Sequence, residues 1–203
     1  MGCVARPRVG YTVWYNNGHK IMNDGGIKTL SSRIAYENRW TRLREDIIRW
    51  PDGSEGLYGV VERADFVVIF PHHANGDVTL VEQYRYPVRR RMIELPMGMW
   101  EEKPGTDPAE VARGELAEET GLLATSLIRV GEVFQGAGYS NQRGHVFHAT
   151  GLRRGEARRE ISEQDMTTHR MPIDQLEAMI RGGEITDAIT IAAFALLRLK
   201  FMI

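Results

Sequence analysis

The segment from Asp107 to Gly121 carries helix signals at both of its ends, and it commits this part of the chain to one short helix. Asp107 is a favoured N-cap residue, Pro108 suits the first helical position, and Glu110 completes a capping box with Asp107. Gly121 supplies a C-cap that adopts the left-handed conformation easily. The apolar residues expected to face a core are Val111, Ala112 and Leu116.

Three acidic residues of this helix, Glu115, Glu118 and Glu119, lie at positions i, i+3 and i+4 and therefore share one face. Like charges at this spacing repel one another, and Gly114 beside them costs the helix about 1 kcal/mol relative to alanine. Such a face is often only a solvated surface. Carboxylates one turn apart can also bind a hard divalent cation, and Mg²⁺ favours one or two carboxylates together with waters and substrate phosphates. The pattern therefore indicates a metal site for phosphate chemistry.

The rest of the chain alternates strand-like runs with a few helices. Strands are expected at 65–71, 77–87, 91–96, 127–134 and 144–152, and helices near 173–181 and 186–200. Because the strands follow no regular β-α-β rhythm, we expect an α/β (α+β) fold with a mixed sheet and helices on its faces.

The N-terminal part is interpreted as a separate, strand-rich region. Residues 1–26 are rich in glycine and asparagine and are expected to be a loosely ordered lead-in. Two or three antiparallel strands are expected between Lys28 and Arg63, with a turn in the segment WPDGSEG. We therefore divide the chain into an N-terminal region at 1–63 and a second domain at 64–203.

Composition argues against several classes of function. The 203 residues carry a net charge of −1, so no overall basic field favours nucleic acid or anionic membranes. The single cysteine, Cys3, rules out an internal disulfide framework and favours a reducing cytoplasm. The apolar segment 188–203 contains Arg198 and Lys200 and is shorter than the roughly 20 residues of a membrane span, so we expect a buried terminal helix. We expect a cytoplasmic protein without nucleic acid or membrane partners.

The segment 94–122, ELPMGMWEEKPGTDPAEVARGELAEETGL, resembles the signature of the Nudix hydrolases, G-x5-E-x7-R-E-U-x-E-E-x-G-U with U aliphatic. Residues 115–122 occupy the E-U-x-E-E-x-G-U positions, and Gly98 matches the opening glycine. The segments VTLVEQYRYPV and EITDAITIAAFALL are similar to the ADP-ribose pyrophosphatase branch of that family. The resemblance implies a Nudix-type α/β/α sandwich, and an N-terminal strand region that commonly helps to form a homodimer.

Two positions depart from the signature. Gly114 occupies the arginine position, and counting back from Glu115 places Thr106 at the first glutamate position, in a loop two residues longer than the pattern. In the family these two charged residues brace the loop against the helix. Because removing both members of an ion pair leaves no charge unpaired, we interpret the double change as coordinated and the metal site as intact. The substitutes that the sequence offers are Glu101, Glu102, Lys103 and Arg113.

The resemblance implies a metal site on the acidic helix. Glu115, Glu118 and Glu119 would bind Mg²⁺, or alternatively Mn²⁺, with help from the backbone carbonyl of Met97. Glu118 is also counted among the catalytic residues. In the ADP-ribose branch a glutamate on a later loop acts as general base, and we assign this role to Glu163 in the segment EISEQDM. The alternatives on this loop are Glu160 and Asp165.

The substrate side of the site is assigned to three further residues. Arg85 matches an arginine that contacts substrate phosphate in this branch, and its alternative is a surface arginine at a strand edge. Glu94 is expected near the substrate or metal, or in a local hydrogen bond. Trp40 would stack on an adenine across a dimer, or would belong to a core. The implied substrate is ADP-ribose or a related nucleoside diphosphate sugar, with GDP-mannose as an alternative and a non-catalytic nucleotide sensor as the rival interpretation.

Overall fold

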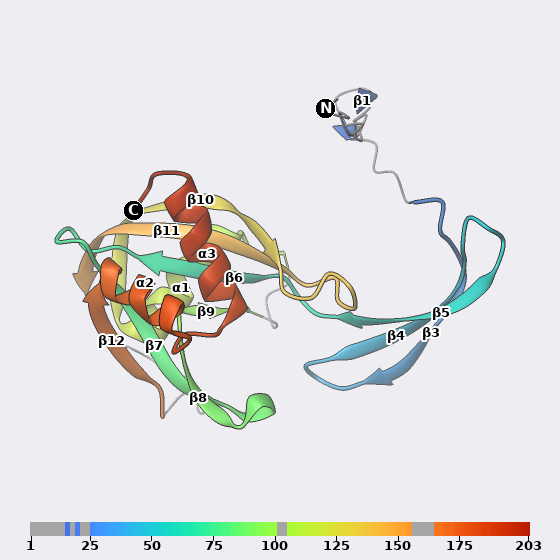
Figure 1. The fold of residues 1–203 in the computed structure, drawn as a ribbon, viewed down its shortest axis with the longest axis horizontal. Coiled ribbons are helices and arrows are strands. Elements are labelled where there is room, and N and C mark those ends of the chain that lie inside the picture. The colour runs from blue at the N-terminus through green and yellow to red at the C-terminus, as the bar shows by residue number, and fades with distance from the viewer. Residues whose placement is uncertain (1–14, 17–18, 21–24, 101–104, 156–164) are drawn as a thin grey trace, which may run out of the picture. The chain divides into compact units, whose positions relative to one another are not determined.

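The computed structural model describes residues 15–16, 19–20, 25–100, 105–155 and 165–203, whose elements are labelled in Figure 1. The chain divides into two compact units. The smaller is made of Met1–Arg33 and Glu45–Tyr58, and the larger of Ile34–Arg44 and Gly59–Ile203.

The larger unit is built on a four-stranded mixed sheet in the order β10-β11-β6-β9. Its strands are β6 (Phe66–Pro71), β9 (Met97–Gly98), β10 (Leu122–Phe134) and β11 (Arg143–Arg154). Strand β6 runs parallel to β11, whereas the other two neighbouring pairs are antiparallel. The expected mixed sheet is confirmed.

Strand β6 is buried on both faces of this sheet, which explains its unbroken apolar sequence FVVIFP. Val67 and Ile69 pack with the helix α1 (Pro108–Thr120), while Val68 and Phe70 belong to a separate apolar cluster. Because successive side chains of a strand point to opposite faces, this one strand contributes to two cores.

A second sheet, β12-β7-β8, is antiparallel and packs on the core that contains Val68 and Phe70. Its strands are β7 (Asp77–Arg85), β8 (Arg90–Glu94) and β12 (Thr167–Pro172). A 3-10 turn at Tyr86–Val88 joins β7 to β8.

Helices α2 (Ile173–Gly182) and α3 (Ala188–Leu199) close this same core with Leu176, Ile189 and Leu197. Helix α1 therefore covers one face of the mixed sheet and α3 the other, which confirms the α/β/α sandwich (Figure 1). In the described part of the chain, no helix is long and apolar enough to span a bilayer.

The N-terminal strands β3 (Lys28–Glu37), β4 (Arg42–Arg49) and β5 (Glu55–Glu62) form a sheet in that order. Short turns connect them: Thr41 N donates to Asn38 Oδ1 at 2.8 Å, and Trp50 N donates to Ser54 O at 2.8 Å. Of the two or three strands expected in this region, the structure has three, and the turn in WPDGSEG is confirmed. Two short strands, β1 (Tyr15–Asn16) and β2 (His19–Lys20), pair with each other.

The segment expected to form a single strand at 91–96 instead contributes to two sheets. Strand β8 ends at Glu94, and Met97 begins β9 in the mixed sheet, opposite Val68. Pro96 between them has no N–H to donate, although its carbonyl accepts a bond from Ile69 N at 2.9 Å. This change of sheet brings Met97 and Gly98 beside α1.

Candidate active site

Helix α1 begins and ends where its capping residues predict. The Asp107 carboxylate accepts a hydrogen bond from Ala109 N at 2.9 Å, and Gly121, at φ 70°, donates its N–H to Ala117 O. As expected, Val111, Ala112 and Leu116 are buried in the core below the helix. The acidic face of α1 is therefore held in a defined orientation.

Two of the three acidic residues are buried against β9. Glu115 is 6% exposed and Glu119 is 1% exposed. Met97 N donates a hydrogen bond to Glu119 Oε2 at 3.2 Å. A Cβ on Gly98 would lie only 2.3 Å from Glu115 Oε2, so a side chain there would displace the carboxylate. This steric conflict explains why the position that opens the sequence motif is a glycine.

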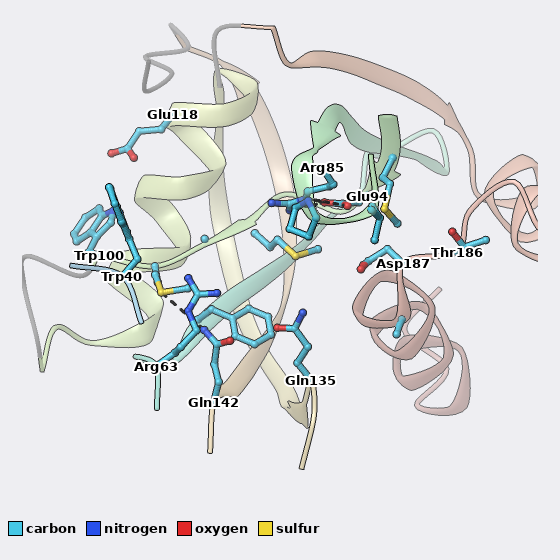
Figure 2. A pocket seen from close by; sticks show the side chains of 18 of the residues that line it. Trp40, Arg63, Arg85, Glu94, Trp100, Glu118, Gln135, Gln142, Thr186 and Asp187 are labelled. Carbon is cyan, nitrogen blue, oxygen red and sulfur yellow. Dashed lines mark hydrogen bonds and ion pairs between the residues drawn. The ribbon is translucent and has the colours of Figure 1, made fainter. Parts of the chain in front are cut away.

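A pocket of about 870 Å³ lies beside this helix, and every lining residue belongs to the larger unit. The charged and aromatic residues that line it include Arg39, Trp40, Arg63, Arg85, Glu94, Trp100, Glu118 and Asp187. Figure 2 shows Glu118 and Trp100 beside α1, and Arg85 with Glu94 across the cavity. Apolar walls with a few converging charged groups are typical of small-molecule sites.

Arg85 and Glu94 form an ion pair in this pocket. Arg85 Nε lies 3.1 and 3.0 Å from the two carboxylate oxygens, and Nη2 lies 2.5 Å from Oε2. The Glu94 side chain is 2% exposed, whereas that of Arg85 is 37% exposed. Burial raises the pKa of Glu94 above its ordinary value, and Arg85 counteracts part of this effect. Burial alone would lower the pKa of Arg85, but the bonds to Glu94 raise it.

Trp40 is 58% exposed and lies outside the described core clusters, so its alternative as a core residue is wrong. The guanidinium carbon of Arg39 lies 5.4 Å from the centroid of its ring, within the range of a cation–π contact. Both side chains line the pocket. An exposed ring beside a cavity can stack on a planar ligand.

Part of the loop that contains the expected general base lies outside the described residues. Glu163 and its alternative Glu160 lie outside the described residues. Asp165 is described, and its carboxylate forms an ion pair with Arg91 at 2.8 Å. It does not contribute to the lining of the pocket. The role of Glu163 stays a prediction.

Several residues of the pocket were not identified from the sequence. Gln142 is buried and donates from Nε2 to Ala64 O at 2.9 Å, and Asp187 caps α3 by accepting from Thr190 N at 2.7 Å. The N-cap pattern of Asp187 was readable in the sequence, but its position on the pocket wall depends on how α3 packs. Arg63 and Trp100 carried no sequence signal of their own.

Two family models match the chain in succession. One, described as a nucleoside diphosphate sugar hydrolase N-terminal domain, matches residues 27–61, and the other, a NUDIX domain, matches residues 62–193. The chain belongs to the Nudix family. The sequence resemblance and the hydrolase class that it implied are therefore confirmed.

Curated relatives and a solved structure agree with this Nudix assignment. An ADP-ribose pyrophosphatase from Mycobacterium tuberculosis is 35% identical over 174 residues, which are 84% of this chain and 83% of the relative. An ADP-ribose pyrophosphatase from Bacillus subtilis is 26% identical over 85% of this chain and 93% of its own. The crystal structure of an ADP compounds hydrolase superposes with a TM-score of 0.76 at 18% identity, covering 87% of this chain and 94% of that one, and so supports the fold.

Nudix enzymes generally use a divalent metal ion. Here the donors on and beside α1 are the carboxylates of Glu115, Glu118 and Glu119 and the main chain of Met97, an all-oxygen set of the kind that hard cations prefer. Among the described residues, no three acidic, histidine or cysteine side chains lie close enough together to hold a metal ion. The chemistry of the donor set nevertheless fits a hard divalent cation.

Proposed function

We propose that this Nudix hydrolase splits the diphosphate bond of ADP-ribose or a related nucleoside diphosphate sugar in a Mg²⁺-dependent reaction, with Mn²⁺ as an alternative ion. The products are a nucleoside monophosphate and a sugar phosphate. The observation that carries this proposal is the position of two buried carboxylates, Glu115 and Glu119, against β9 beside a pocket with arginine and tryptophan side chains.

The cation would be held by Glu115, Glu118, Glu119 and the carbonyl of Met97. When bound, it would neutralise charge on the diphosphate and activate a water molecule for attack on phosphorus. Burial of Glu115 and Glu119 supports this assignment, because buried carboxylates in proteins are paired with a cation or coordinate a metal.

The chain's own residues would bind and orient the substrate. Arg85 uses Nε and Nη2 to hold Glu94, so its Nη1 edge would donate to a phosphate oxygen while Glu94 keeps the guanidinium in place. Trp40, with Arg39 over its ring, would stack on the base. Glu163 would accept the proton of the attacking water, with Glu160 and Asp165 as the alternatives.

The names of the two curated relatives support ADP-ribose as the first substrate to test. The full chain should be incubated with ADP-ribose, GDP-mannose and other nucleoside diphosphate sugars, with and without Mg²⁺. We expect AMP from ADP-ribose, dependent on the metal and lost in Glu119→Gln.

The matched control is Glu110→Gln, which makes the same chemical change on an exposed position of the same helix and should keep full activity. Faster turnover of GDP-mannose would reassign the substrate. Binding of nucleotides without turnover of any of them, under Mg²⁺ or Mn²⁺, would instead support the sensor interpretation.

We also propose that the strands of residues 1–63 join two copies of the chain into a homodimer, and that 64–203 forms the hydrolase domain. Ile34 and Tyr36 on one face of β3 are 46% and 56% exposed, which supports burial by a partner. A cytoplasmic location stays a prediction based on the single Cys3.

A further inference from the structure

Trp100 occupies the space above Gly114 on α1. A Cβ on Gly114 would lie 2.1 Å from Cζ2 of the indole and 2.9 Å from Cη2, closer than real Cβ atoms come to other atoms. Gly114 does not have a positive φ, so no special backbone angle accounts for it. The contact with the indole accounts for glycine at this position.

This neighbour differs from the one that the sequence suggested. Gly114 was paired with Thr106 because both depart from the Nudix signature. Arg113, one of the expected substitute braces, donates from Nη1 to Ala124 O on β10 at 2.9 Å. The other expected substitutes, Glu101, Glu102 and Lys103, lie outside the described residues. Among the described candidates, Trp100 is the residue that meets the helix at the arginine position.

The indole is anchored in the structure that carries the acidic residues. Trp100 packs against the small core that holds Val111 and Leu116 of α1. It lies two residues after β9, whose Gly98 adjoins the Glu115 carboxylate and whose Met97 N donates a hydrogen bond to Glu119. The segment 97–100 therefore contacts α1 at Gly114, Glu115 and Glu119.

Trp100 also limits the third carboxylate. Gly114 and Glu118 are four residues apart on α1, so they are neighbours on one helix face. Trp100 and Glu118 both line the pocket, and Figure 2 shows them on the same side of α1. An indole seated on Gly114 therefore bounds the space into which the Glu118 side chain can turn.

We propose that Trp100 is a positioning residue of the metal site. Its indole, seated on Gly114, sets the separation of α1 from β9 and thereby the placement of Glu115, Glu118 and Glu119. This inference rests on the proposed function, because these carboxylates must bind the cation for their placement to matter. The contact of Trp100 with Gly114 is apolar, whereas the family signature has a charged pair at this place. Its effect on the metal site should therefore not be screened by salt.

The test compares Gly114→Ala, Trp100→Leu and the double variant with the wild-type full chain. Mn²⁺ is titrated without substrate and followed by electron paramagnetic resonance, and urea unfolding reports stability. The matched control is Gly182→Ala in α2, where the nearest contact of a new Cβ would be Glu184 Oε1 at an ordinary 3.7 Å. Trp100→Leu opens space and creates no overlap, so it remains informative if Gly114→Ala does not fold.

We expect each single variant to weaken Mn²⁺ binding about tenfold, as loss of a residue that orients metal ligands usually does. The double variant should bind about as well as either single variant, because both changes break the same contact. Raising Mg²⁺ to saturation should restore kcat/KM to within about threefold of the wild type. The Gly182→Ala control should bind Mn²⁺ like the wild type.

Folded single variants with wild-type affinity for Mn²⁺ would overturn the positioning role and leave the proposed function standing. If the double variant loses Mn²⁺ affinity by the product of the two single factors, the positioning role would also be overturned, since independent sites behave in that way. A wild-type chain that neither binds Mn²⁺ nor hydrolyses any nucleotide sugar would overturn the proposed function itself.

Discussion

Replacing Arg85 by methionine would leave the Glu94 carboxylate in the pocket wall without its ion-pair partner. Three hydrogen bonds join the two side chains, and Glu94 is 2% exposed, so the guanidinium and not solvent compensates its charge in the native protein. Breaking a buried pair from one side costs about 3–5 kcal/mol. We expect a loss of this size in the free energy of unfolding at pH 7.

The opposite replacement, Glu94→Gln, should cost less. The side chain of Arg85 is 37% exposed and can turn towards solvent, so we expect a loss of about 1–2 kcal/mol. The two single variants should therefore lose unequal amounts of unfolding free energy, although they break the same hydrogen bonds.

The dependence on pH gives a second signature. Burial already raises the pKa of Glu94 above 4.5, and Arg85 lowers it, so removal of Arg85 should raise this pKa further. A carboxyl group whose pKa is raised by folding stabilises the protein at acid pH and loses that contribution as the pH rises through the folded pKa. The destabilisation of Arg85→Met should therefore shrink between pH 8 and pH 5.

Urea unfolding of the single variants and of Arg85→Met/Glu94→Leu at pH 5 to 8 checks these expectations. The double variant should recover most of the stability, since an apolar pair replaces the ionic one. If it also recovers wild-type kcat/KM with ADP-ribose, Arg85 does not bind the phosphate. Equal losses in the two single variants, unchanged by pH, would refute the reasoning about burial.

Three further outcomes follow from other contacts. Gly98→Ala should raise the Mg²⁺ concentration for half-maximal activity about tenfold, because its Cβ would displace the carboxylate of Glu115; an unchanged metal requirement would contradict this. The pKa of His148, paired with His72 at 3.1 Å, is lowered by burial from 6.5 to about 4, so stability should fall as the pH drops below 6.5. This linkage is worth about 2 kcal/mol between pH 8 and pH 5 and should be absent from urea unfolding of His148→Gln. Ile34→Glu should convert the proposed dimer into a monomer in sedimentation velocity, whereas an unchanged sedimentation coefficient would argue against β3 as the interface.

Much of the fold was accessible from the sequence because its signals are local. The caps of α1 at Asp107 and Gly121 act within a few residues, and the spacing of the carboxylates follows from helical geometry. The apolar run of β6 indicates a strand buried on both faces without reference to its partners. The division of 91–98 into β8 and β9 was missed, since it depends on which sheet each half joins.

The family, the acidic face of α1 and the residues expected to hold the cation follow from local sequence patterns. The pairing of Glu94 with Arg85, the room that Gly98 leaves for Glu115 and the position of Trp100 on Gly114 became visible only in the folded chain. Helix caps and periodicity depend on hydrogen bonds and side-chain directions within one element. Contacts between β9 and α1, or between β7 and β8, depend on how whole elements pack. Because the interior is close-packed, the position of each element depends on all the side chains of the core.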